Sequence, residues 1–212
     1  MQNEQGDYYE SHDIGNVLLM LPAAATASTL SDGPTQEQIE SPPILVKFGV
    51  AMTYATLSAI GCFFVFMLFS LFYPLISFSL SFAFATTTFF WPYAKSSWDV
   101  MGGCVGVCML LYFAAKILHE EQVQNKTVLF AGGALALAGS FRVSLAPFLV
   151  LGFLALLYFA RSKVRWRHVV IFLVVVFVGM IPSFIYNFVR MGSPLRPATT
   201  ASQYDVVNVS MP

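Results

Sequence analysis

The stretch "GGALALAGSFRVSLAPFLVL" at residues 132–151 contains one charged residue, Arg142, within an otherwise uncharged run from Val128 to Ala160. As a single helix, a run of 33 residues would be about 50 Å long at about 1.5 Å per residue. The hydrocarbon core of a bilayer is only about 30 Å thick. We therefore expect the chain to turn at Arg142, with one membrane helix on each side of the turn.

The composition is that of an integral membrane protein. Hydrophobic residues make up 57% of the chain and charged residues only 10%, and the mean hydropathy is +0.70. A soluble domain usually has about 25% charged residues, which cover its surface. The formal net charge of zero says little about partners, because in a membrane protein the distribution of charge matters more than its sum.

The charge and hydropathy patterns predict an all-α, polytopic transmembrane helix bundle of about six spans in three regions. Residues 1–43 hold seven acidic residues and no Lys or Arg, and we interpret them as an external loop segment with a short interfacial helix at Val17–Ala27. Residues 44–190 form the bundle, and residues 191–212 form an external tail. Phe48–Ala94 is too long for one span and is expected to turn at Ser70–Pro74. The remaining predicted spans are Val100–Leu118, Thr127–Phe141, Ala146–Ala160 and Val169–Phe188.

The loop charges predict the orientation of the bundle. Six spans place both termini on the same side of the membrane. The densest basic cluster is "RSKVRWR" at residues 161–167, and short basic loops tend to stay in the cytoplasm. The termini, the turn after Trp91 and the turn at Arg142 are then expected to face the outside.

The cysteines do not indicate a metal site. Cys62, Cys104 and Cys108 all fall within predicted spans, without the His or acidic neighbours of a metal centre. We interpret them as small apolar packing residues.

Four motifs follow one another in an order typical of one enzyme superfamily. They are "GDYYESHDIGNVLLMLP" at 6–22, "ATTTFFWPYAKSSWD" at 85–99, "AGGALALAGSFRVSLAPFLVL" at 131–151 and "IPSFIYNFVRMGSPL" at 181–195. Taken alone, the second motif resembles an aromatic belt with a Lys95–Asp99 ion pair. Taken alone, the fourth motif resembles the end of a helix, where the chain leaves through Gly192 and Pro194. Together they resemble the GT-C superfamily of polytopic glycosyltransferases, in the branch of protein O-mannosyltransferases and aminoarabinose transferases (the glycosyltransferase family 39 type).

The resemblance implies a membrane glycosyltransferase of the bacterial plasma (inner) membrane. Such enzymes transfer a sugar from a polyprenyl-phosphate carrier to a glycan, lipid or protein acceptor on the external face. The implied partners are membrane lipid, the lipid-linked donor and the acceptor, with no nucleic acid. The donor is a substrate, no resident cofactor is indicated, and the involvement of a divalent metal stays open.

The resemblance also suggests roles for individual residues. A cation is needed beside the donor phosphate, and the planar guanidinium of Arg142 suits a phosphate best. Lys95 and Arg190 are further candidates for the same anionic pocket. Asp7 is the nearest carboxylate that can act as the catalytic base. The substrate-binding candidates are Glu10, His12, Tyr93, Asp99, Asn187 and Ser193, of which Asp99 stands where the family more often has Glu.

Other interpretations of the same residues remain open. Arg142 can also be a snorkelling residue that caps a helical hairpin. A polytopic transporter or flippase-like subunit would use the same arginines to line a path for an anionic or lipid-linked substrate, and a purely structural membrane subunit is a third interpretation. Relatives have a span and an acidic motif before the first of these motifs, and more helices after the last. We therefore expect this chain to be an internal fragment, or to need a partner chain.

Overall fold

The computed structural model describes residues 44–88 and 100–191, together with Gly15, Leu18, Leu19, Leu21, Pro22 and Ala25. In these residues the fold is all-α, with no β-strand. The six residues near the N-terminus are helical, and they fall on or beside the expected interfacial helix. The six long helices are α3 (Ile44–Phe72), α4 (Ser77–Thr87), α6 (Val100–His119), α7 (Asn125–Phe141), α8 (Ala146–Phe159) and α9 (Trp166–Met191).

The helices end where the sequence predicts chain breaks. The turn between α3 and α4 contains Pro74, which has no backbone N–H to continue a helix. The break at Arg142 is confirmed, since this residue is extended, with φ −155° and ψ 88°. A short 3₁₀ helix, η1 (Val143–Leu145), follows, and α8 then begins with Pro147 in its first turn. The second predicted span is shorter than expected, because α4 ends at Thr87 and Thr88 is extended; Ala94 itself lies outside the described residues.

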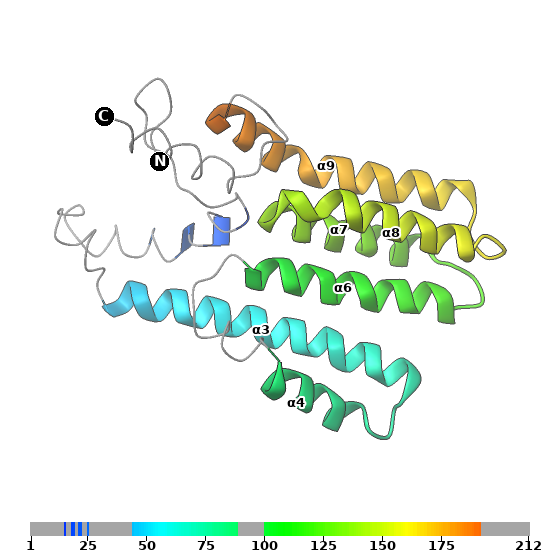
Figure 1. Cartoon of the computed structure of the whole chain (residues 1–212), viewed down its shortest axis with the longest axis horizontal. Helices are drawn as coiled ribbons and strands as arrows, with labels where there is room; N and C mark the ends of the chain where they lie inside the picture. Colours follow the sequence, from blue (N-terminus) through cyan, green and yellow to red (C-terminus); the bar gives the residue numbers. More distant parts are fainter. Residues whose placement is uncertain are drawn as a thin grey trace, which may run out of the picture.

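Five helices lie side by side in the order α4, α3, α6, α7, α9, and α8 packs on α7 (Figure 1). Successive helices run in opposite directions, so the connections collect at two ends of the bundle. We call one the basic end; it contains residues 73–76, 120–124 and 160–165. We call the other the Arg142 end; it contains the turn between α7 and α8, the start of α6 and the last turns of α4 and α9. This alternation agrees with the predicted hairpin at Arg142.

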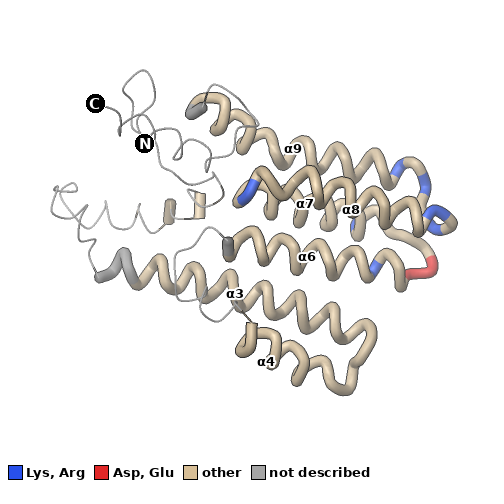
Figure 2. Tube along the Cα trace, viewed as in Figure 1, with Lys and Arg blue, Asp and Glu red and all other residues tan. Residues whose placement is uncertain are grey.

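Charge is distributed unequally between the two ends (Figure 2). Among residues whose side chains are described, the Arg142 end carries one charged residue, Arg142 itself. The other charged residues in that set belong to the basic end: Lys116, Glu120, Glu121, Lys126, Arg161, Lys163, Arg165 and Arg167. The ends of the bundle are therefore chemically distinct.

Small residues allow α7 to approach α6 and α9 closely. A Cβ added at Gly106 of α6 would lie 2.6 Å from the backbone nitrogen of Ala138 in α7, and one at Gly102 would enter the ring of Phe141. On the other side of α7, a Cβ at Gly132 would lie 3.1 Å from Val175 of α9. Such close backbone contact is common between membrane helices, where lipid removes the hydrophobic drive for association.

The outward surface is apolar, as a lipid environment requires. Large side chains on several helices are mostly exposed, including Phe78 at 74%, Phe148 at 75% and Phe177 at 64%. Three helices are long and apolar enough to cross a membrane, at Phe48–Phe72, Met101–His119 and Trp166–Val189. The helices α4, with 11 residues, and α8, with 14 residues, are shorter. Length and composition thus indicate a membrane protein, with three helices among the described residues that could cross the bilayer.

The close contact of α6 with α7 predicts that Gly106→Ala destabilises the bundle. The added methyl group would press on the Ala138 backbone, and overpacking of this kind costs about 1–3 kcal/mol. Gly133→Ala in α7 is the matched control, because nothing lies within 4 Å of its Cβ position and Ala favours a helix by up to about 1 kcal/mol. Unfolding in mixed micelles measures both. Equal stability of the two variants would contradict the close approach.

Candidate functional site at the Arg142 end

Arg142 lies at the tip of the hairpin formed by α7 and α8. Its backbone N–H donates to the Ala138 carbonyl at 3.1 Å, and its own carbonyl accepts from the Leu145 N–H at 2.9 Å. These two bonds fix the backbone of the turn. The side chain is exposed, and its guanidinium has no hydrogen bond or ion pair with any residue that the structure describes. The turn therefore presents an unpaired cation at the end of two apolar helices.

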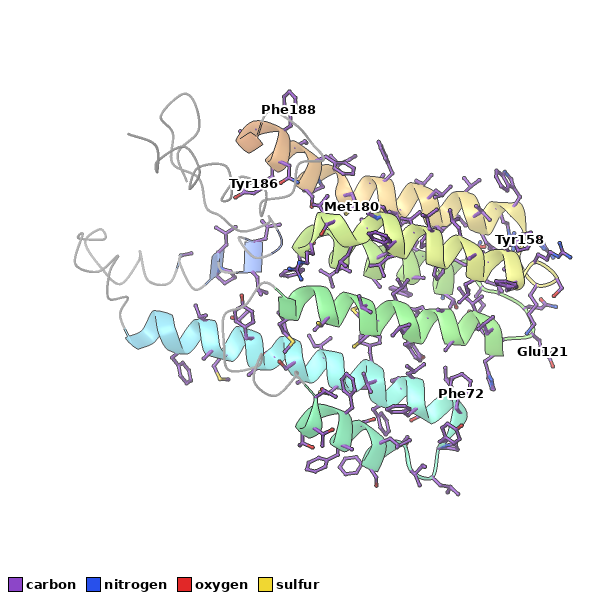
Figure 3. All side chains as sticks on the ribbon, in the orientation of Figure 1. Phe72, Glu121, Tyr158, Met180, Tyr186 and Phe188 are labelled. Atoms are coloured by element: carbon purple, nitrogen blue, oxygen red, sulfur yellow. The ribbon has the colours of Figure 1, made fainter. Side chains whose placement is uncertain are left out.

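The packing of α7 on α9 determines which residues lie level with Arg142. Gly132 contacts Val175, and Ala136 contacts Gly179, so the two helices run in the same direction with one register. Six residues beyond the Ala136–Gly179 contact, the same register places Arg142 level with Ile185. Figure 3 shows Met180 and Tyr186 on this part of α9, with Phe188 pointing away from the bundle.

The inner face of α9 becomes polar toward this level. Phe172, Val176 and Met180 are buried on this face, and Ser183 and Asn187, one and two turns further on, are each only 1% exposed. Buried polar side chains in a membrane helix are costly and tend to mark substrate paths. Asn187, predicted from the sequence to bind substrate, therefore belongs to the buried face on the turn level with Arg142.

Ser183 is a polar residue that the sequence interpretation missed. Its hydroxyl is buried and has no hydrogen-bond partner among the residues that the structure describes, although helical serines usually donate to the carbonyl four residues earlier. Ser58 does so to Tyr54 at 2.8 Å, and Ser81 to Ser77 at 2.7 Å. Pro182 is the adjacent residue and lies inside α9, where its ring leaves the Val178 carbonyl without its usual helical donor. In the sequence, the adjacent residues Pro182 and Ser183 were the feature that could have indicated this polar position in α9.

The N-terminal motif reaches the same end of the bundle. A Cβ added at Gly15 would lie 2.8 Å from the Ser140 carbonyl oxygen, so this part of the first motif packs beside the end of α7. Three of the four sequence motifs thus place described residues at the Arg142 end, namely Gly15, Ser140 and Asn187. The second motif begins there as well, in the last turn of α4.

The side chains of the other predicted site residues are not described by the structure. Arg190 lies in the last turn of α9, and its side chain is outside the described part of the chain. The remaining candidates lie outside the described residues altogether: Asp7, Glu10, His12, Tyr93, Lys95, Asp99 and Ser193. The site that can be described therefore consists of Arg142, Ser183 and Asn187 near the start of α6.

At the opposite end, Lys163 fastens the last loop to α6. Its Nζ donates to the carbonyls of Leu118 at 3.0 Å and Glu120 at 2.9 Å, which places a cation at the negative end of the α6 dipole. Lys116 pairs with Glu120 at 3.7 Å. These lysines hold the loops of the basic end in place; the Lys116–Glu120 pair has the i,i+4 spacing of a helical ion pair, whereas the contact of Lys163 spans more than forty residues and was not predicted.

The cysteines pack between helices. Cys108 is buried, and Cys62 and Cys104 are partly buried, in the apolar cluster that joins α3 to α6.

No protein-family model, no curated protein and no solved structure matches this chain.

The unpaired hydroxyl predicts that Ser183→Ala stabilises the bundle. A buried polar group without a partner costs about 1–3 kcal/mol, so its removal should raise the free energy of unfolding by about 1 kcal/mol in detergent without substrate. Ser58→Ala is the control, since it removes a hydroxyl that is already hydrogen-bonded and should not stabilise. If both substitutions lower stability equally, Ser183 has a partner in the folded protein.

Proposed function

We propose that this chain is a membrane glycosyltransferase, or part of one, that takes a sugar from a polyprenyl-phosphate donor at the Arg142 end. The observation that carries the proposal is the unpaired guanidinium of Arg142 in the turn between two apolar helices. In this proposal Arg142 binds the donor phosphate. Ser183 and Asn187 donate hydrogen bonds to the phosphate or sugar, and Lys95 and Arg190 complete the anionic pocket.

The chemistry of the reaction explains why a cation is needed at this depth. Transfer of the sugar breaks the bond between its anomeric carbon and the phosphate oxygen, and the bond electrons leave with the polyprenyl phosphate. The negative charge of that leaving group grows at the edge of a low-dielectric region, where a fixed cation stabilises it strongly. Arginine can hold two phosphate oxygens at once through its planar fork.

The proposed orientation has six spans, with the basic end in the cytoplasm and the Arg142 end outside. The charge difference between the ends supports this orientation, because basic loops remain cytoplasmic. In this arrangement α7 and α8 cross the membrane as a hairpin, and the acceptor approaches from the external face. In this proposal the protein lies in a bacterial plasma membrane, as the resemblance implies.

A transporter or flippase-like subunit is the second candidate. The buried polar face of α9 favours it, since Ser183 and Asn187 are buried on a long apolar helix that also contains Pro182. In that case the anionic or lipid-linked substrate moves past Arg142 and keeps its sugar.

Sugar transfer distinguishes the two candidates. Vesicles containing the chain are supplied with a polyprenyl-phosphate donor radiolabelled in the sugar, and label is followed both to acceptor and across the membrane. Transfer of label to acceptor supports the glycosyltransferase. Movement of intact donor without transfer supports the transporter, and activity with a soluble nucleotide sugar in membranes without polyprenyl phosphate contradicts the proposed donor.

Cysteine labelling tests the orientation with two matched substitutions. Ser144 and Ser162 are both exposed serines in turns at opposite ends of the bundle. In a background without Cys62, Cys104 and Cys108, Ser144→Cys should react with a membrane-impermeant maleimide from the external side. Ser162→Cys should react only after the membrane is opened. Labelling of Ser162→Cys from outside, or of both positions from one side, would contradict the proposed topology.

Arg142 substitutions test donor binding independently of turnover. Arg142→Ala removes a charge-assisted contact worth roughly 1.5–3 kcal/mol, so affinity for polyprenyl phosphate should fall roughly tenfold to hundredfold. Arg142→Lys keeps the charge but loses the bidentate fork, and its affinity should be intermediate. Lys126→Ala, an exposed cation in the first turn of α7 at the basic end, is the control. If folded Arg142→Ala binds polyprenyl phosphate with unchanged affinity, Arg142 does not bind the donor phosphate and only caps the hairpin.

A further inference from the structure

Three arginines at the basic end lack acidic partners. Arg161, Arg165 and Arg167 are all exposed, and none forms an ion pair with a carboxylate in the described part of the chain. Arg161 and Arg165 lie in the six-residue connection at 160–165 between α8 and α9, and Arg167 is the second residue of α9. Three guanidinium groups therefore share one short surface without internal charge compensation.

Lys163 and Glu120 at the basic end already have partners within the protein. Lys163 lies between these arginines in the sequence, but its Nζ binds the Leu118 and Glu120 carbonyls. The carboxylate of Glu120 pairs with Lys116 and lies 3.4 Å from the Thr127 hydroxyl. The first turn of α9 contains no acidic residue. Arg165 and Arg167 lie at the start of α9, near the positive end of its dipole, where a bound anion is favoured and a cation is not.

Exposed aromatic side chains border the arginines. Trp166 is 76% exposed and Phe159 82% exposed. The Arg161 guanidinium carbon lies 5.2 Å from the Tyr158 ring centre, and its Nη1 donates to the Tyr158 hydroxyl at 3.4 Å. Tryptophan and tyrosine gather at the depth of lipid headgroups. The arginines therefore lie at the level where phosphodiester groups are found.

We propose that Arg161, Arg165 and Arg167, with Trp166, form a binding surface for anionic phospholipid headgroups of the adjacent leaflet. Arginine is suited to phosphodiesters because its fork binds two oxygens, and basic segments beside membrane helices attract anionic lipid. The exposed Trp166 and Phe159 favour a lipid over a nucleic acid, since their apolar area is matched by acyl chains. This surface is separate from the proposed donor site at the Arg142 end.

Lipid titration of the purified, detergent-solubilised chain tests this surface. Retention of phosphatidylglycerol and of phosphatidylcholine is followed by native mass spectrometry. The unaltered chain should retain phosphatidylglycerol in preference to phosphatidylcholine. Each Arg→Gln substitution should weaken phosphatidylglycerol binding about fivefold, and R161Q/R165Q/R167Q about a hundredfold. The corresponding triple Arg→Lys variant should lie between, because it keeps the charge and loses the fork.

Glu121→Gln is the control at the same end, since it removes a charge of the opposite sign and should leave binding equal or stronger. Helical content and size-exclusion behaviour show whether the triple variant folds. If it does not, phosphatidylglycerol retention is measured with the single variant R167Q instead. Equal retention of both lipids would overturn the proposal, as would full phosphatidylglycerol binding by folded R161Q/R165Q/R167Q or R167Q. Displacement of the lipid by inorganic phosphate or a short RNA at equal concentration would also overturn it, by assigning the surface to a soluble anion.

Discussion

The close approach of α7 to helices on both sides is the interaction on which the rest of the bundle depends. Gly106 of α6 brings one backbone against Ala138, and Gly179 of α9 receives Ala136 on the opposite side of α7. Lipid is as apolar as the helix surfaces, so association relies on van der Waals packing at short range. The glycines also fix the register of α7 against α9. That register determines that the turn at Arg142 lies level with the polar part of α9 rather than its apolar part.

The charged groups at the two ends of the bundle have different partners. At the basic end, Lys163 and Lys116 are used within the protein, and they tie loops to the end of α6. At the Arg142 end, the cation is left without a partner among the described residues, while the nearby turn of α9 buries a hydroxyl that is also unpaired. Unsatisfied polar groups are expensive in an apolar medium. A polar, anionic ligand at the Arg142 end would supply the contacts that Arg142 and Ser183 lack among the described residues.

Much of the fold follows from length, charge and proline. The bilayer thickness required a break near Arg142, and the chain breaks there. The predicted starts of the helices at Val100 and Ala146 agree with the structure, and Pro74 lies in the predicted turn after the first span. These features are local, so the sequence contains them directly.

Tertiary features were harder to predict. The role of Lys163 depends on the loop between α8 and α9 being brought to the end of α6 over more than forty residues of chain, and no local pattern encodes that contact. The unpaired state of Ser183 depends on the geometry next to Pro182 and on burial against α7. The site was predicted only in outline: Arg142 and Asn187 fall at the same end, whereas Lys95, Tyr93, Asp99 and the acidic N-terminal candidates lie outside the described residues.

Photo-crosslinking of the donor tests the central claim most directly. A polyprenyl phosphate with a diazirine on the first isoprene unit is bound in vesicles, irradiated and mapped by mass spectrometry. Binding of its phosphate by Arg142 predicts adducts at the end of α7, the start of α8 and the Ser183–Asn187 turn of α9, which disappear with excess unlabelled polyprenyl phosphate. Adducts confined to residues 116–126 and 158–167, or spread along the lipid-facing surfaces without competition, would contradict the assignment of the donor site to the Arg142 end.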